Sequence, residues 1–164
     1  MLTTSNPMEQ ITKVLKYKIP GFIDEALKVS IKDERKRQGK YEKWLKGKAR
    51  AHYKRDKKRG YGKNITVAKY KEAMHNAVMH STGQDVYTGE KLDWHLIGTF
   101  DSMRAQRGGE KYFREYALLP TIDHEYPIKK EGKFQICAWR TNDAKGYLNL
   151  EEFKVLCEKI LQHR

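Results

Sequence analysis

The positive charge of this chain lies entirely in its first half. Residues 1–80 contain 21 Lys and Arg against 8 Asp and Glu, whereas residues 81–164 contain 13 of each. The formal net charge of +13 therefore belongs to the first 80 residues. A concentration of unneutralised positive charge indicates a polyanionic partner, and it predicts a basic region joined to an electrically balanced one.

The charge is densest in residues 38–63, which hold 11 Lys and Arg against only two acids, Glu42 and Asp56. Aromatic side chains are spaced through the same tract: Tyr41, Trp44, Tyr53 and Tyr61. Cations that displace counterions, together with rings that stack on bases, are typical of a nucleic-acid-binding surface. The other interpretation is a solvated helix face. We expect DNA contact, with RNA also open, from Lys54, Arg55, Lys57, Lys58 and Arg59.

Length and composition exclude other classes of protein. A chain of 164 residues with 38% hydrophobic residues suffices for one compact domain. No apolar stretch approaches the roughly 20 residues of a membrane-spanning helix, so we expect no membrane partner, and the first residues do not resemble a signal peptide. The two cysteines, Cys137 and Cys157, are too few for a disulfide scaffold or a four-cysteine zinc site. They predict reduced thiols in a cytoplasmic protein.

The first half shows the periodicity of helices. Apolar spacing predicts helices over residues 8–18, 22–31 and 40–58, with breaks at Pro20-Gly21 and Gly39 and an end near Gly60. Thr66 has the character of an N-cap for a fourth helix that stops before Gly83. We therefore interpret residues 1–82 as a helical, basic region that contacts nucleic acid.

The second half has a different texture. Residues 86–92 predict a tight turn, Gly108-Gly109 a loop and residues 129–132 a polar turn. Apolar runs over 116–122 and 134–139 predict two strands, followed by a short helical turn that ends at Gly146 and a helix capped by Asn149. The expected fold class is α+β, with residues 83–164 as the second unit of what we expect to be one compact domain.

Three polar residues follow the two predicted strands. Asp123 and His124 close the first strand, and Asn142 lies just beyond the second. An acid, an imidazole and an amide oxygen are the groups that a metal-assisted phosphodiesterase requires: oxygen ligands hold a hard divalent cation, and a neutral imidazole activates water. Adjacent strand residues point to opposite faces, so Asp123 and His124 can share a phosphate only where the strand bends or ends.

At this point the segment resembles the HNH endonuclease family, the ββα-metal nucleases. The resemblance covers residues 85–164, about half of the chain. It rests on Tyr87-Thr88-Gly89, on Asp123-His124 followed by Pro127, and on Asn142-Asp143-Ala144-Lys145-Gly146, with about 18 residues between His124 and Asn142.

The resemblance implies an HNH-type endonuclease that hydrolyses phosphodiester bonds in DNA. It assigns His124 as the general base and Asp123 and Asn142 as the ligands of one divalent metal ion, for which Mg²⁺ is the first choice. Lys145 and Arg140 are the expected nucleic-acid contacts. Two features depart from the family. The orienting asparagine is missing where this chain reads Glu131-Gly132-Lys133, and the absence of paired cysteines predicts no structural zinc. The unit would then be held by packing of Trp139, Phe134, Phe153 and Leu156.

Two other interpretations stay open or are set aside. A non-catalytic nucleic-acid-binding module on a degenerate HNH scaffold is the alternative function. Residues 141–152 also imitate a calcium-binding EF-hand loop, but Lys145 would stand where an oxygen ligand is required, so we do not expect calcium binding. The sequence does not decide between a monomer and a homodimer.

Overall fold

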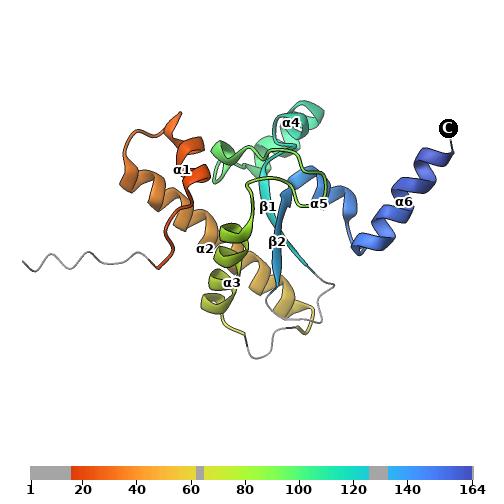
Figure 1. The fold of residues 1–164 in the computed structure, drawn as a ribbon, viewed down its shortest axis with the longest axis horizontal. Helices are drawn as coiled ribbons and strands as arrows, with labels where there is room; N and C mark the ends of the chain where they lie inside the picture. Colours follow the sequence, from red (N-terminus) through yellow and green to blue (C-terminus); the bar gives the residue numbers. More distant parts are fainter. Residues whose placement is uncertain (1–15, 62–64, 126–132, 164) are drawn as a thin grey trace, which may run out of the picture.

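The fold combines helices with one small antiparallel sheet and is of the α+β class (Figure 1). The structure is a computed structural model that describes residues 16–61, 65–125 and 133–163. In chain order its elements are α1 (Gly21–Lys28), α2 (Glu34–Lys58), α3 (Val67–His80), the 3-10 turn η1 (Trp94–Leu96), α4 (Ser102–Glu115), β1 (Pro120–His124), β2 (Phe134–Ala138), α5 (Trp139–Lys145) and α6 (Leu150–Gln162). Within the described ranges, no helix has both the length and the apolar composition needed to cross a bilayer.

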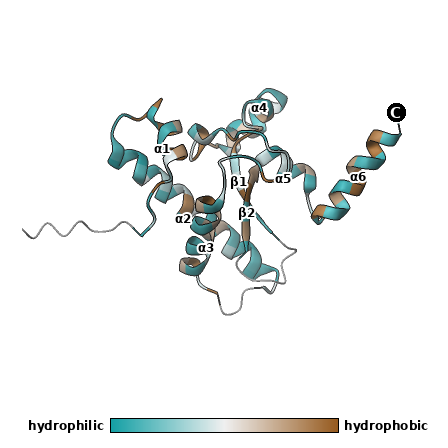
Figure 2. Ribbon diagram, viewed as in Figure 1, coloured by the Kyte–Doolittle hydropathy of each residue, from teal (hydrophilic) through white to brown (hydrophobic). Residues whose placement is uncertain are grey.

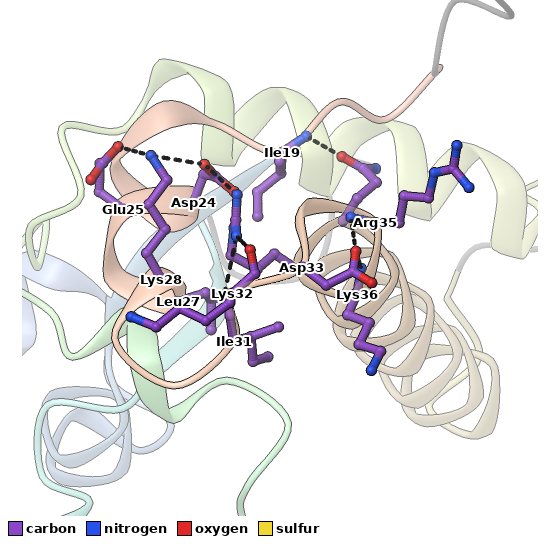
Figure 3. A network of polar contacts seen from close by, with 12 residues as sticks. Ile19, Asp24, Glu25, Leu27, Lys28, Ile31, Lys32, Asp33, Arg35 and Lys36 are labelled. Atoms are coloured by element: carbon purple, nitrogen blue, oxygen red, sulfur yellow. Dashed lines mark hydrogen bonds and ion pairs between the residues drawn. The ribbon is translucent and has the colours of Figure 1, made fainter.

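The long basic helix α2 begins earlier than the sequence predicts. We expected a helix from Lys40 after a break at Gly39, but α2 begins at Glu34 and passes through Gly39. Asp33 caps it, because its side chain accepts hydrogen bonds from two backbone N–H groups of the first turn (Figure 3). The prediction was wrong because this cap and the packing of the first turn outweigh the roughly 1 kcal/mol that a helical glycine costs.

Arg37 fastens the start of α2 to α1. Its side chain forms an ion pair with Asp24 of α1 and donates hydrogen bonds to the carbonyl oxygens of Lys32 (2.7 Å) and Ile31 (3.1 Å). The two carbonyl oxygens are thus hydrogen-bonded without being part of a helix. The periodicity predicts a helix that reaches residue 31, but α1 ends at Lys28.

The helix after Gly60 is confirmed. Gly60 follows the end of α2 with a φ of +80°, and Thr66 caps α3 by accepting a hydrogen bond from the Lys69 N–H at 3.2 Å. Of the helix predicted over residues 8–18, residues 8–15 lie outside the described residues. Residues 16 and 17 form a turn, and residue 18 is not helical, so the prediction is wrong for that end.

The two predicted strands pair as one antiparallel ladder, but the first is shorter than predicted. Pro120 lies opposite Ala138 and His124 opposite Phe134. Residues 116–118 form a turn because the carbonyl oxygens of residues 117 and 119 accept hydrogen bonds from the first N–H groups of α5. At its other end, the ladder stops at the pair of His124 and Phe134. The predicted turn over 86–92 is closed by a bridge between Gln84 and Lys91, and the turn predicted over 129–132 lies outside the described residues.

The loop predicted at Gly108-Gly109 is a kink inside α4. Only Gly109 leaves the helical region, with a φ of +51° that favours glycine. At Gly108 a side chain would approach Tyr112 to 2.8 Å, so packing accounts for Gly108 and backbone conformation accounts for Gly109.

One hydrophobic core draws on both halves of the chain. α2 contributes Tyr41, Trp44 and Leu45, and α3 contributes Met74 and Val78, all buried. From the second half, Trp94, Ile122, Phe134 and Ile136 join the same cluster. The sheet is therefore packed against the basic helix and α3, which places the end of β1 beside the last turns of α2.

The C-terminal helix α6 stands apart from this core (Figure 1). It begins with the predicted capping box between Asn149 and Glu152, and none of its residues is buried. Leu156 is 43% exposed and Ile160 59% exposed. The prediction that Phe153 and Leu156 hold the ββα unit together is therefore wrong. Apolar and polar residues alternate along α6, which packs against no other described helix or strand (Figure 2).

Candidate active site

A cavity of about 710 Å³ opens where β1 ends. It brings together the three polar residues that the sequence singled out, because Asp123, His124 and Asn142 all line it. Arg55 and Arg59 from the last turns of α2 line the same cavity. A site assembled in this way presents an acid, an imidazole, an amide and two guanidinium groups to one ligand.

The Asp123 carboxylate is held from two sides. Its Oδ2 accepts a hydrogen bond from the Tyr87 hydroxyl at 2.7 Å and lies 3.1 Å from the Lys145 Nζ, while its Oδ1 accepts the backbone N–H of His124 at 2.9 Å. Burial, with the Asp123 carboxylate beside it, raises the pKa of Tyr87 well above its ordinary value, so this phenol stays a donor.

Tyr87 itself was part of a motif but had no predicted role. Its hydroxyl also accepts a hydrogen bond from Gln135 on β2, and its backbone N–H donates to Asp85 at 2.9 Å. Asp85 is buried and accepts the Thr141 hydroxyl of α5 at 2.6 Å. This network ties the turn before Gly89 to β2 and α5, so the turn serves to position Asp123.

His124 is oriented by a residue that sequence reasoning missed. Its Nε2 lies 2.9 Å from the Oδ2 of Asp56, 68 positions earlier in the chain on α2. A carboxylate only accepts hydrogen bonds, so Nε2 carries a proton, and in the neutral imidazole Nδ1 then keeps its lone pair. Nδ1 makes no hydrogen bond with any residue in the described ranges. Asp56 is therefore the residue that orients the His124 ring.

Asp56 is enclosed almost completely. Its side chain is 2% exposed, and its Oδ2 also accepts a hydrogen bond from the Tyr70 hydroxyl at 2.7 Å. Its Oδ1 is buried and has no hydrogen-bond partner among the described residues. A buried carboxylate is costly unless it is paired, which favours a functional reason for it. The sequence offered one indication of this role: Asp56 and Glu42 are the only acids among the 11 Lys and Arg of residues 38–63.

The ring of His124 is fixed by packing as well as by Asp56. Phe134 lies 5.0 Å and His52 5.3 Å from it between ring centroids. His124 is the last residue of β1 and is directed toward α2, whereas Asp123 is directed toward Lys145 on α5. The two neighbours thus point to different elements, as strand geometry requires, and still line one cavity.

The residues at the end of β1 fit a hard cation in kind. Asp123 and Asn142 supply carboxylate and amide oxygens, and the Asn142 side chain makes no hydrogen bond with a described residue. No three His, Cys, Asp or Glu side chains gather as a metal-holding group anywhere in residues 16–61, 65–125 and 133–163. The Lys145 ammonium group lies 3.1 Å from Oδ2 of Asp123, so a cation bound there would share this oxygen with it.

The predicted nucleic-acid contacts fall into two groups. Lys54, Lys57 and Lys58 are exposed on α2 beside Arg55 and Arg59 and outside the cavity lining. Arg140 forms an ion pair with Glu90 on the surface, and Lys145 is 8% exposed, with Nζ donating to the Leu148 carbonyl at 2.9 Å. The structure thus leaves the α2 residues open, while Arg140 and Lys145 each have an acidic partner.

Stability is expected to fall below neutral pH because of His52, which is 5% exposed. Burial lowers its pKa to about 2, and the positive charges of Arg55 and Lys48 on α2 add to the effect. The folded protein keeps His52 neutral while the unfolded chain protonates it near pH 6.5, so stability is lost as the pH falls. The expected loss is about 1.4 kcal/mol per pH unit from pH 6.5 to about 4.5.

Urea unfolding of the protein and of His52→Gln over the same pH range measures this loss. The variant should show a shallower dependence, because the group that resists protonation is gone. Equal slopes for the two proteins would contradict the prediction.

Comparisons with protein-family models, with curated proteins and with solved structures found no match to this chain.

Proposed function

We propose that this protein is a cytoplasmic, metal-dependent endonuclease that hydrolyses phosphodiester bonds in DNA through an HNH-like ββα site. The observation that supports this function best is the state of His124. Its Nε2 is hydrogen-bonded to the buried Asp56, and its Nδ1 has no hydrogen-bond partner among the described residues. His124 also lines the same cavity as Asp123 and Asn142. A neutral imidazole with one nitrogen anchored and the other free is the arrangement of a general base.

The residues of the chain divide the reaction among them. Arg55 and Arg59 hold the phosphate by charge-assisted hydrogen bonds. Nδ1 of His124 takes a proton from a water molecule as the water attacks phosphorus, and the Asp56 carboxylate stabilises the imidazolium that forms. A divalent ion held by Asp123 and Asn142 would supply electrostatic stabilisation of the leaving 3′ oxygen. The products are a 5′-phosphate and a 3′-hydroxyl.

Supercoiled plasmid distinguishes this function from simple binding. The purified protein should nick or linearise the plasmid with Mg²⁺ or Mn²⁺, and EDTA should stop the reaction. Asp123→Asn should be strongly impaired, because it removes a charged oxygen ligand, whereas Glu115→Gln, at an exposed site on α4, should cut as well as the parent. No cleavage of plasmid or of single-stranded DNA under any metal would overturn the proposal. Cleavage of RNA in preference to DNA would overturn the choice of substrate.

One observation favours the second candidate, a nucleic-acid-binding module without catalysis. Lys145 places an ammonium group 3.1 Å from the Asp123 oxygen that a metal would use. A cation held there by the protein lowers the need for a metal ion and competes with it. Salt-sensitive DNA binding with no metal-dependent cutting would support this module.

The exposed lysines of α2 should carry part of the salt dependence of binding. Replacing Lys54, Lys57 and Lys58 with Gln removes three cations that have no acidic partner among the described residues. The slope of log affinity against log salt should become shallower by about one unit for each DNA phosphate that a lysine no longer neutralises. Fluorescence anisotropy of a labelled duplex from about 50 to 200 mM salt measures the slope. An unchanged slope would show that the footprint lies elsewhere.

A further inference from the structure

A second cavity lies at the opposite end of β1 from the candidate active site. It has a volume of about 560 Å³, and Leu119 and Pro120 line it where β1 begins. Across from them, α2 presents four lysines: Lys36, Lys40, Lys43 and Lys48. Among the described residues, no acidic side chain lines the cavity.

The four ammonium groups have no neutralising partner in the described part of the chain. None of these lysines forms an ion pair with a described residue, and Lys48 donates its one hydrogen bond to the Thr121 hydroxyl at 3.0 Å. Burial lowers the pKa of Lys48 to about 8, which reflects how poorly its charge is solvated. Four like charges around one hollow repel each other unless an anion lies between them. Trp44 and Phe100 add aromatic surface to the same walls.

The geometry points to a second backbone-phosphate subsite for the same DNA, formed by Lys36, Lys40 and Lys43 on α2. This inference rests on the proposed function for the identity of the ligand. The two cavities share α2: Lys43 and Arg55 are 12 residues apart, about 18 Å along a helix. At 3.4 Å per nucleotide along a duplex, that distance corresponds to roughly five base pairs. The subsite therefore binds DNA about half a helical turn from the phosphate that is cut.

Binding to duplexes of two lengths tests the subsite. Affinity for a duplex of about 16 base pairs should exceed that for a hairpin with a stem of about 4 base pairs, because a stem shorter than the five-base-pair separation cannot reach both cavities. In the triple variant Lys36→Gln, Lys40→Gln, Lys43→Gln the gain from length should be reduced at least tenfold. A matched variant, Lys69→Gln, Lys91→Gln, Lys111→Gln, lowers the net charge equally at exposed positions away from the cavity and should keep the gain.

The outcomes separate the two proposals. The triple variant should still nick plasmid when protein is saturating, because the residues at the end of β1 are untouched. If both variants show the same length dependence, the subsite is wrong even where the parent protein cuts DNA. If no protein cuts but the length dependence disappears only in the first variant, the nuclease proposal fails and the subsite stands.

A different observation supports an inference about assembly. α6 has no buried residue, and Leu156, Ile160 and Leu161 leave 43%, 59% and 65% of their surface exposed. At 100° per residue these side chains share a stripe with Phe153 and Cys157, whereas Val155 lies on the other face. A helix of 13 residues is marginal in water by itself and is stabilised when its apolar face packs against another surface.

The charges beside the stripe are self-complementary. Lys154 and Glu158 lie on one flank, and Glu152 and Lys159 lie on the other. In an antiparallel pair of identical helices, like flanks meet and residues equally distant from the centre face each other. With the centre at Leu156, Lys154 faces Glu158 of the second copy. Within one chain Lys154 contacts only Glu151, at 3.1 Å, and Glu158 and Lys159 form no ion pair with a described residue.

We infer that α6 pairs antiparallel with α6 of a second copy of this chain to form a homodimer. A two-fold dimer carries two cutting sites, so it could cut both strands of a duplex in one encounter, whereas a monomer would need two successive nicks. The interface is small, so the dimer forms at protein concentrations of about 1–100 μM.

Two oppositely charged variants test the pairing by sedimentation velocity. Lys154→Glu places two acids on the flank that Lys154 shares with Glu158, and Glu158→Lys places two bases there. In a dimer of either variant like charges face each other, so each variant alone should dimerise at least tenfold more weakly than the parent. An equimolar mixture of the two should recover the dimer, because every facing pair is then opposite in charge. Val155→Glu, on the other face, should dimerise like the parent. A parent protein that stays monomeric, or a mixture that fails to recover, would overturn the inference.

Discussion

Replacing His124 with Ala should abolish metal-dependent nicking of plasmid while leaving salt-dependent binding to DNA nearly unchanged. The variant lacks the only group at the end of β1 that combines an anchored Nε2 with a free Nδ1 in the described residues. A general base contributes about 10²–10⁴-fold to a hydrolytic rate, so the turnover number should fall by at least about 100-fold. Single-turnover kinetics with saturating protein, followed on agarose gels, measure the change.

His124→Ala also removes the partner of a buried carboxylate, so a second variant keeps the result interpretable. His124→Gln retains an N–H donor for Asp56 but has no nitrogen that accepts a proton. It should be as inactive as His124→Ala and closer to the parent in thermal stability. If His124→Gln cuts DNA at the parent rate, His124 is not the base. If both variants also lose DNA binding, the histidine holds the fold and the catalytic role is wrong.

Asp56→Asn should reduce cleavage by about 10²–10³-fold, although Asp56 is not expected to touch the substrate. The amide oxygen can still accept the Nε2 hydrogen of His124, but the amide has no negative charge with which to stabilise the imidazolium that forms in the reaction. The loss should appear in the turnover number, with the DNA affinity kept, because Asp56 is a positioning residue. Nitrogen NMR of the histidine side chains should show His124 protonated on Nε2 in both proteins, which separates loss of the charge from loss of the tautomer.

The same substitution separates positioning from stability. Asp56 keeps one carboxylate oxygen buried with no described hydrogen-bond partner, so its replacement by a neutral amide should not lower the thermal midpoint. Tyr70→Phe is the matched variant: it removes one donor to Asp56 and leaves the contact with His124 in place. It should lose little activity. An inactive Asp56→Asn that has also unfolded would contradict the positioning role.

Much of the local structure could be predicted from the sequence because its signals are local. Thr66 and Asn149 cap helices through hydrogen bonds to residues three positions away, and Gly146 ends α5 with a φ of +54°. Element ends set by distant contacts could not be predicted. The start of α2 is fixed partly by the pairing of Arg37 with Asp24 of α1, and β1 begins only at Pro120 because the carbonyl oxygens of residues 117 and 119 bond to α5.

The candidate site shows the same division. Asp123, His124 and Asn142 form a pattern along about 20 residues of chain, so sequence spacing predicts that they lie together, and all three line one cavity. The group that orients His124 lies 68 positions away, on a helix that sequence reasoning assigned to binding alone. No periodicity links the two positions. Only the packing of α2 beside the sheet brings Asp56 to Nε2.

The hydrogen bond between Asp56 and His124 limits how this protein can be divided or recombined. A fragment that starts at residue 83 would carry every residue of the HNH resemblance and lack the carboxylate that selects the histidine tautomer. Fusing that fragment to a foreign DNA-reading domain would therefore yield a tethered but inert scaffold. Under the proposed function, a working chimera must carry α2 with it, and a newly synthesised chain could cut DNA only after its second half has folded back onto its first.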